Sequence, residues 1–179
     1  PNYNADTLEN DIAVANVNRS FQSREKAKIP KGSSRISGRS TSFGYGKKKT
    51  PTSHFENDGN GWSQTGGSNG RMDRKLRKLE SRILPKSVCN QAISNLSVEH
   101  RLANDAEVCI EVNKRRNLCE GDSGGPTFVK GELIGVASRV SFDVSVDEDR
   151  ALVRKCDGSG PTILTSVKRY RNWVKRNIR

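Results

Sequence analysis

The stretch CEGDSGGP, residues 119–126, places a single serine, Ser123, between the pairs Gly121–Asp122 and Gly124–Gly125. Glycine adopts backbone conformations that are closed to other residues, and it has no side chain to obstruct an approaching ligand. A serine framed in this way is typical of a nucleophile displayed on a sharp turn. Ser123 is therefore a candidate catalytic nucleophile, and its reactivity would depend on a base and an acid supplied elsewhere.

The composition predicts a modest hydrophobic core and extensive loops. Only 32% of the 179 residues are hydrophobic, and the mean hydropathy is −0.78. No apolar run approaches the roughly 18 residues that a membrane-spanning helix needs, so we expect no membrane span. The chain begins PNYNADTLEND, with neither a methionine nor an apolar leader. We therefore expect it to be a piece of a longer protein.

The chain is strongly basic, with 32 Lys and Arg against 20 Asp and Glu and a net charge of +12. Residues 24–49 hold nine Lys or Arg against one Glu, and residues 71–86 form a second basic stretch. These stretches could bind a polyanion such as a sulfated glycan, or they could form a solvated face, which we favour. We expect no nucleic-acid partner, because no groove-binding motif accompanies the charge.

Cysteine usage indicates an oxidising compartment. The four cysteines contain no CxxC spacing, so we expect structural disulfides rather than a zinc or other metal site. Four cysteines allow three pairings, and their number alone does not choose among them. Glycosylation sequons at Asn18 and Asn95 agree with secretion. The expected location is extracellular.

Hydrophobic patterning in the first half of the chain is weak. Residues 11–17, DIAVANV, predict a buried strand, whereas the polar stretch 47–70 predicts a long flexible surface loop. Residues 71–84, RMDRKLRKLESRIL, fit a helix, but residues 79–84 could also be a strand, and both interpretations stay open. Pro85 should begin a short helix that reaches Cys89.

The second half is clearer. TFVKGELIGVAS, residues 127–138, predicts a hairpin whose two apolar arms flank Lys130-Gly131. Residues 141–155 form a charged insert. Residues 166–179 predict a C-terminal helix capped by Ser166, with one basic face and one apolar face. The apolar face would consist of Val167, Tyr170, Trp173, Val174 and Ile178.

The order of residues along the chain limits which catalytic triad Ser123 could join. Its Gly-x-Ser-x-Gly context also occurs in α/β-hydrolases, but their histidine follows the serine, and here no histidine does. Asp11, His54 and Ser123 formally match the subtilisin order, yet nothing in the polar loop around His54 would fix its ring. We therefore interpret His54 and His100 as solvated surface side chains.

Several segments resemble the trypsin-like serine proteases. CEGDSGGP resembles the nucleophile motif of that family, and residues 1–17 are similar to the segment that carries the triad aspartate. SFGYGK, residues 42–47, resembles a turn of the family's second barrel. GELIGVAS, residues 131–138, resembles the strand along which substrate lies, and residues 161–178 resemble the terminal strand and helix.

This resemblance implies an all-β fold, the chymotrypsin-like double Greek-key β-barrel, with a C-terminal α-helix. Residues 1–21 would be the end of the first barrel, residues 22–165 the second barrel with long basic loops, and residues 166–179 the helix. The resemblance further implies that Cys89 pairs with Cys109 and Cys119 with Cys156.

The resemblance also implies catalytic roles. Ser123 would be the nucleophile, the N–H groups of Gly121 and Ser123 the oxyanion hole, and Asp11 the acid that orients a histidine. Asp122 would pair with the amino terminus that zymogen cleavage creates. The family's histidine would lie before Pro1. The 179 residues alone therefore lack the general base, and the missing amino-terminal half of the first barrel becomes an expected partner.

Substrate-binding positions carry over in the same way. Trypsins have an acid six residues before the serine, and here that position is the uncharged Asn117. Val140 and Thr162 would narrow the pocket walls, Ser138 would border the substrate, and Arg139 replaces the usual aromatic residue. These substitutions imply a preference for small uncharged residues at the cleavage position of a peptide or protein substrate.

The function that follows is a secreted serine endopeptidase that acts through an acyl-enzyme and needs no cofactor. Two alternatives stay open. A catalytically inactive homologue would keep the fold as a secreted binding protein, and a basic secreted module would bind polyanions.

Overall fold

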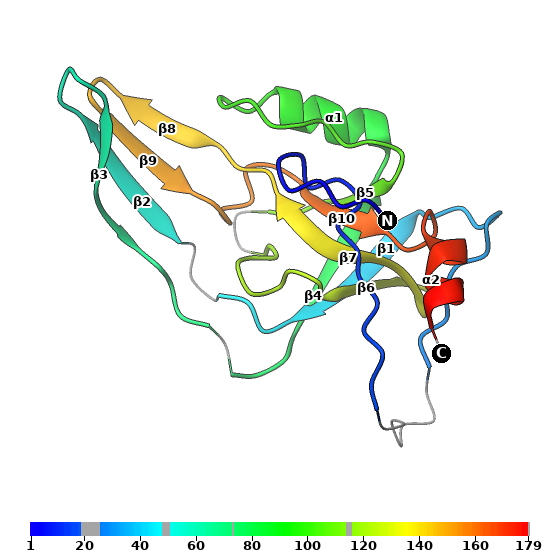
Figure 1. Ribbon diagram of the computed structural model, residues 1–179. Helices are drawn as coiled ribbons and strands as arrows, with labels where there is room; N and C mark the ends of the chain where they lie inside the picture. Colours follow the sequence, from blue (N-terminus) through cyan, green and yellow to red (C-terminus); the bar gives the residue numbers. More distant parts are fainter. Residues whose placement is uncertain (19–25, 48–50, 73, 114–115, 179) are drawn as a thin grey trace.

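The computed structural model describes residues 1–18, 26–47, 51–72, 74–113 and 116–178 (Figure 1). Its main body is a closed barrel with the strand order β1-β4-β5-β10-β7-β6, and a separate four-stranded sheet has the order β3-β2-β9-β8. The barrel strands are β1 (Gly38–Gly44), β4 (Arg77–Leu84), β5 (Glu107–Ile110), β6 (Pro126–Val129), β7 (Glu132–Val140) and β10 (Thr162–Ser166). No helix in the described ranges has the length and apolar character to cross a membrane.

Apolar side chains from five segments fill the barrel. The central cluster is buried and is joined at its edge by partly buried residues such as Leu79 and Ile83; its buried members are Ile110, Leu118, Val129, Ile134, Ala137 and Leu164. Because the barrel is closed, each of its strands pairs with a neighbouring strand on both sides.

Part of the barrel interior is polar, and its hydroxyls bind one another. The buried hydroxyl of Ser42 lies 2.7 Å from that of the buried Thr127, and Ser40 lies 2.8 Å from Ser81. Each hydroxyl can donate to its partner, which offsets the cost of removing it from water. Two serines of the basic stretch 24–49, Ser40 and Ser42, therefore lie in the barrel wall.

The predicted hairpin at residues 127–138 is confirmed as β6 and β7. Lys130 and Gly131 both have positive φ, 50° and 78°. Two successive residues with positive φ form the turn whose twist matches that of the flanking strands, which is why a two-residue connection suffices here.

The choice left open between helix and strand is resolved as a strand over residues 77–84. All seven residues of β1 pair with β4, from Gly38 opposite Ile83 to Gly44 opposite Arg77. Along β4 the residues that turn toward the core are Leu79, Ser81 and Ile83, at a spacing of two. The sequence of this segment fits both a period of two and a helical period, and it forms a strand because it pairs with β1.

The prediction of a flexible loop over residues 47–70 is wrong. Two strands, β2 (Thr52–Asn57) and β3 (Trp62–Ser68), form an antiparallel hairpin there. The charged insert at 141–155 contains a second hairpin, β8 (Val144–Asp147) and β9 (Arg150–Arg154). Five residues of β2 pair with β9, so the two hairpins make one sheet that projects from the barrel (Figure 1). Backbone hydrogen bonds hold it together, and they leave little hydrophobic signal in the sequence.

Both predicted disulfides are present. Cys89 on α1 (Lys86–Ser94) bonds Cys109 on β5, across 20 residues of sequence, and Cys119 bonds Cys156 across 37. Loops of these lengths contribute roughly 3 to 4 kcal/mol each by restricting the unfolded chain. Residue Pro85 precedes the first helical residue, as expected.

The C-terminal helix is shorter than predicted. Helix α2 spans Arg171–Asn177, and the residue before it, Tyr170, gives no side-chain cap. Ser166, the predicted cap, instead lies at the buried end of β10. Val174 is buried as predicted, whereas Ile178 is 54% exposed. The predicted apolar face starts at the end of β10 and crosses a turn before α2 begins, so its spacing does not belong to one helix.

The predicted buried strand at residues 11–17 is also wrong. Residues 1–18 contain turns and one isolated bridge, Asn4 to Glu9, and Val17 is 57% exposed. No strand in the described part of the chain pairs with this segment. Side-chain contacts with the barrel hold it in place instead.

Candidate active site

Two consecutive turns shape the backbone at Ser123. The N–H of Asp122 donates to the carbonyl of Cys119, and the N–H of Gly125 donates to the carbonyl of Asp122, each at 2.9 Å. Ser123 lies between these bonds and is exposed. The φ angles of Gly121 and Gly124 are 93° and 75°, in the region that favours glycine. The sequence prediction of a serine displayed on a glycine-dependent turn is therefore met in the structure.

Strand β7 fixes this turn. The N–H of Gly124 donates to the carbonyl of Ala137 at 2.8 Å, and the N–H of Ala137 donates to the carbonyl of Gly125 at 2.9 Å. At Gly125 a Cβ would lie 2.7 Å from the carbonyl oxygens of Asp122 and Phe43. A side chain at this position would force the backbone apart, so the glycine is required for the close approach.

The next residue of β7 holds Asp11. The hydroxyl of Ser138 donates to Oδ2 of Asp11 at 2.8 Å, although 127 residues separate them in sequence. Asp11 and the turn of Ser123 are therefore both attached to neighbouring residues of one strand, Ala137 and Ser138. The structure thus brings the predicted substrate-binding residue Ser138 into contact with Asp11 and attaches the turn of Ser123 to the preceding residue of the same strand.

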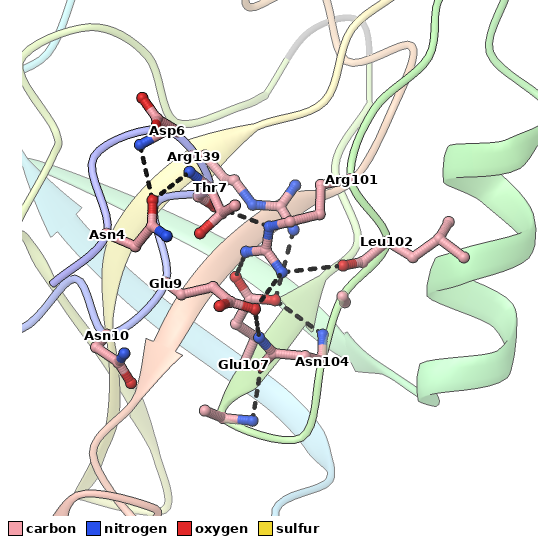
Figure 2. Close-up of polar contacts among 12 residues, drawn as sticks. Asn4, Asp6, Thr7, Glu9, Asn10, Arg101, Leu102, Asn104, Glu107 and Arg139 are labelled. Carbon is pink, nitrogen blue, oxygen red and sulfur yellow. Dashed lines mark hydrogen bonds and ion pairs between the residues drawn. The ribbon is translucent and has the colours of Figure 1, made fainter. Parts of the chain in front are cut away.

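A polar cluster on the barrel holds the segment that carries Asp11 (Figure 2). Nε of Arg101 donates to the carbonyl of Thr7 at 2.8 Å, and Nδ2 of Asn104 donates to Oε1 of Glu9 at 2.9 Å. The hydroxyl of Tyr170 donates to Oδ1 of Asn10 at 2.5 Å. Burial raises the pKa of this phenol, which keeps it in the donating form.

Glu107 is the buried centre of this cluster. One of its oxygens is in close contact with Nη2 of Arg101, and the other accepts from the N–H of Asn104 at 2.9 Å and lies 3.5 Å from Nη2 of Arg139. The exposed fractions of the side chains are 5% for Glu107, 26% for Arg101 and 11% for Arg139. Burial lowers the pKa of Arg139, and Glu107 opposes that shift.

Glu107 and Arg101 were not among the functional residues predicted from the sequence. Glu107 begins the short strand β5 and looks in sequence like one of many scattered charges. A weak signal was the replacement of the usual aromatic residue by Arg139, because a guanidinium at a covered position requires an acid nearby. The sequence alone could not identify which acid that is.

The Asp122 carboxylate is buried and bonded to backbone. It accepts from the N–H of Gly46 at 2.7 Å and from the N–H of Cys119 at 2.9 Å. A Cβ at Gly44 or Gly46 would overlap this carboxylate. The glycines of the SFGYGK turn therefore make room for Asp122. In the described part of the chain the carboxylate has no ion-pair partner.

Three of the residues predicted to form the substrate pocket are neighbours in the structure. The hydroxyl of Thr162 donates to Oδ1 of Asn117 at 2.8 Å, and Thr162 pairs with Val140 in the register of β10 and β7. Nδ2 of Asn117 is buried and has no partner in the described residues. The uncharged amide predicted at the base of the pocket is thus in contact with one of the predicted walls.

Neither histidine is bonded to these groups in the described ranges. His54 is exposed, as predicted, but it lies on β2 opposite Gly66 and Leu152 rather than in a loop. His100 is not a solvated side chain, because its ring packs edge-on against Phe142 with centroids 4.9 Å apart. Its Nε2 lies 2.6 Å from the carbonyl of Phe142.

Comparisons with known proteins agree on one family. The family model described as Trypsin matches residues 1–174. Alkaline trypsin B of Manduca sexta is 27% identical over 180 residues, covering 99% of this chain and 59% of the relative. A chymotrypsin-like serine proteinase of Haliotis rufescens is 31% identical over 100 residues, covering 56% of this chain and 34% of the relative. Neuropsin, a serine protease of mouse brain, matches in structure with a TM-score of 0.65 at 19% identity, over 98% of this chain and 65% of neuropsin.

The likeness to neuropsin shows the fold alone, and that fold is the chymotrypsin-like one implied by the sequence. The chain spans 59% of the length of the alkaline trypsins that it matches. The family model, by contrast, covers nearly all of the chain. The matched residues include the glycine-framed turn of Ser123 and strand β7, whose Ser138 binds Asp11. On that evidence this chain belongs to the trypsin family of serine proteases.

Proposed function

We propose that this chain is the serine-bearing part of a secreted endopeptidase, with Ser123 as its nucleophile and Asp11 as the acid of its triad. The observation that carries the proposal is the double attachment to β7. Ala137 binds the turn of Ser123, and the adjacent Ser138 binds Asp11. A triad acid holds and orients a histidine that in turn serves the serine, so an acid and a serine turn attached to one strand support this assignment. The two buried disulfides are consistent with an extracellular location.

The proposed chemistry is acyl transfer followed by hydrolysis. A histidine removes the proton of the Ser123 hydroxyl as its oxygen attacks the peptide carbonyl, and then gives that proton to the leaving amine. The N–H groups of Gly121 and Ser123 stabilise the negative oxygen of the intermediate, a contribution of about 3 to 4 kcal/mol per donor. Water then releases the acyl group from Ser123. The histidine is proposed to come from residues that precede Pro1.

The proposal is tested with a fluorophosphonate probe on the protein that carries its upstream residues. Ser123 should be labelled, Ser123→Ala should abolish labelling, and Asp11→Asn should slow it by about 10⁴-fold, as expected for a misoriented histidine. Asp6→Asn is the control, because Asp6 is an exposed acid of the same segment. Full-rate labelling of the Asp11→Asn protein would show that Asp11 is not the triad acid.

Cleavage specificity gives a separate prediction. Asn117 offers no charge to a basic side chain, and burying an unpaired guanidinium or ammonium is costly. We expect cleavage after Ala, Val or similar small residues. Asn117→Asp should raise kcat/KM for substrates with Arg or Lys at that position by about 10- to 100-fold, the worth of one charged hydrogen bond.

A peptide library cleaved by the protein with a complete triad measures this preference. Asn60→Asp is the matched control, since it adds the same charge at the exposed turn between β2 and β3. A wild-type profile dominated by basic residues, or equal shifts from both variants, would overturn the pocket assignment.

A catalytically inactive homologue that acts as a secreted binding protein is the second candidate. One observation favours it: in the described part of the chain no histidine is bonded to Ser123 or Asp11, and Asp122 is bonded to backbone N–H groups rather than to an amino terminus. Absence of probe labelling in the protein with its upstream residues would select this candidate over the endopeptidase.

A further inference from the structure

Like charges face one another on the outer side of the barrel. Arg39 of β1 lies directly opposite Arg82 of β4 in the antiparallel register, and both are exposed. Two cations at opposed positions repel and destabilise a strand pair. An anion lying over the two guanidinium groups would relieve this repulsion.

A hollow lies at this position. It has a volume of about 410 Å³. Its lining combines three arginines with two glutamates and smaller polar groups, and it includes Arg39, Glu80, Ser81, Arg82, Glu111 and Arg116. A second hollow of about 520 Å³ shares Glu80 and Arg116 with the first. It adds Lys47, Arg77 and Lys78, so basic side chains line a continuous path beside β4.

The first hollow has three arginines against two glutamates, so its described lining carries one excess positive charge. Other cations of this surface have partners: Lys78 lies 2.9 Å from Glu80, and Lys47 lies 2.5 Å from Glu120. Arg39, Arg82 and Arg116 form no ion pair or side-chain hydrogen bond within the described ranges. The pKa of Glu80 is lowered mainly by hydrogen bonds from Lys78 and Thr41, with a contribution from the charge of Arg39.

We propose that this surface, defined by Arg39, Arg82 and Arg116, binds a sulfated polysaccharide. Planar guanidinium groups bind sulfate oxygens through paired hydrogen bonds, and several of them along a strand pair match a chain of repeated anions. Among the described residues, the lining of the two hollows includes no aromatic side chain on which nucleic-acid bases could stack. A disulfide-bonded chain of net charge +12 is also suited to an extracellular polyanion.

Heparin binding of the 179-residue chain tests the proposal without requiring protease activity. The dissociation constant is measured at several NaCl concentrations, because each anion contact contributes about one unit to the slope of log Kd against log salt. Replacing the three arginines together, Arg39→Gln, Arg82→Gln and Arg116→Gln, should lower that slope by about two to three units. Chemically desulfated heparin of the same length should not bind.

The matched control removes three positive charges elsewhere: Arg154→Gln on β9 with Lys175→Gln and Arg176→Gln on α2, all of which are exposed. It should lower the slope by less than one unit. Equal losses in the two triple variants would show that net charge alone drives binding and would overturn the site. A triple Arg→Lys variant should retain most of the slope, which separates lost contacts from lost folding.

Two further results would also overturn the proposal. One is the absence of heparin binding at 0.05 M NaCl, and the other is equal affinity for duplex DNA with the same sensitivity to the arginine substitutions. The second result would assign the surface to a phosphate polyanion instead.

Discussion

The 179-residue chain alone should react with a fluorophosphonate probe about 10⁶-fold more slowly than a complete protease of this family. A serine hydroxyl is a weak nucleophile unless an adjacent base takes its proton. His54 is exposed on β2, and the ring of His100 is packed against Phe142, so neither is placed to serve Ser123. Loss of the triad histidine costs about 10⁶-fold in kcat, or about 8 kcal/mol of barrier.

The labelling rate is measured by mass spectrometry of the Ser123 peptide, with Ser123→Ala as the background. Adding an upstream polypeptide that carries the family's histidine should restore labelling if the base lies there. Rapid labelling of the chain by itself would mean that a base exists within these residues, and His54→Gln and His100→Gln would then identify it. His100→Gln should otherwise leave the slow rate unchanged.

Replacing Glu107 with leucine should lower the free energy of unfolding by about 3 to 5 kcal/mol, the usual cost of breaking a buried ion pair. Glu107 is the only acid within hydrogen-bond reach of Arg139 among the described residues, and Arg139 is almost fully covered. Without Glu107, its guanidinium would stay buried and unpaired. Arg101 loses the same partner but is more exposed and can turn toward solvent.

Urea unfolding of the oxidised chain measures this loss. Glu80→Leu is the control, because Glu80 is an exposed acid whose pairing with Lys78 is at the surface, and it should change the midpoint little. The double variant Glu107→Leu with Arg139→Leu should recover much of the stability, since an apolar pair can replace a buried ion pair. No difference between Glu107→Leu and Glu80→Leu would show that the cluster is not buried in solution.

The Glu107 cluster also bears on Asp11. Arg101 connects Glu107 to the carbonyl of Thr7, four residues before Asp11. Loss of Glu107 should therefore increase hydrogen exchange in residues 4–12 before the barrel itself unfolds. The segment that presents Asp11 would then be the first part of the chain to open.

The turns that depend on local backbone conformation could be predicted from the sequence. The glycines around Ser123 and the Lys130-Gly131 turn need positive φ, and few residues supply it cheaply. The two disulfides followed from the family pattern and are present. The glycine-framed turn of Ser123 was likewise expected from its motif, and Asn117 and Thr162, predicted separately as pocket residues, are in contact. The turns are encoded within a few residues, whereas the disulfide pairing was available only through the family resemblance.

Contacts between distant segments were decided by the tertiary structure. The pairing of β2 with β9 relies on backbone groups that every residue carries, so polar stretches 47–70 and 141–155 gave no sign of it. Residues 11–17 have the composition of a strand but pair with none of the described strands. The role of Glu107 exists only because folding brings Arg101 and Arg139 to one buried carboxylate. Sequence alone determined the turns and the residues capable of chemistry, and tertiary structure decided which strands pair and which charges meet, because both depend on groups far apart in the chain.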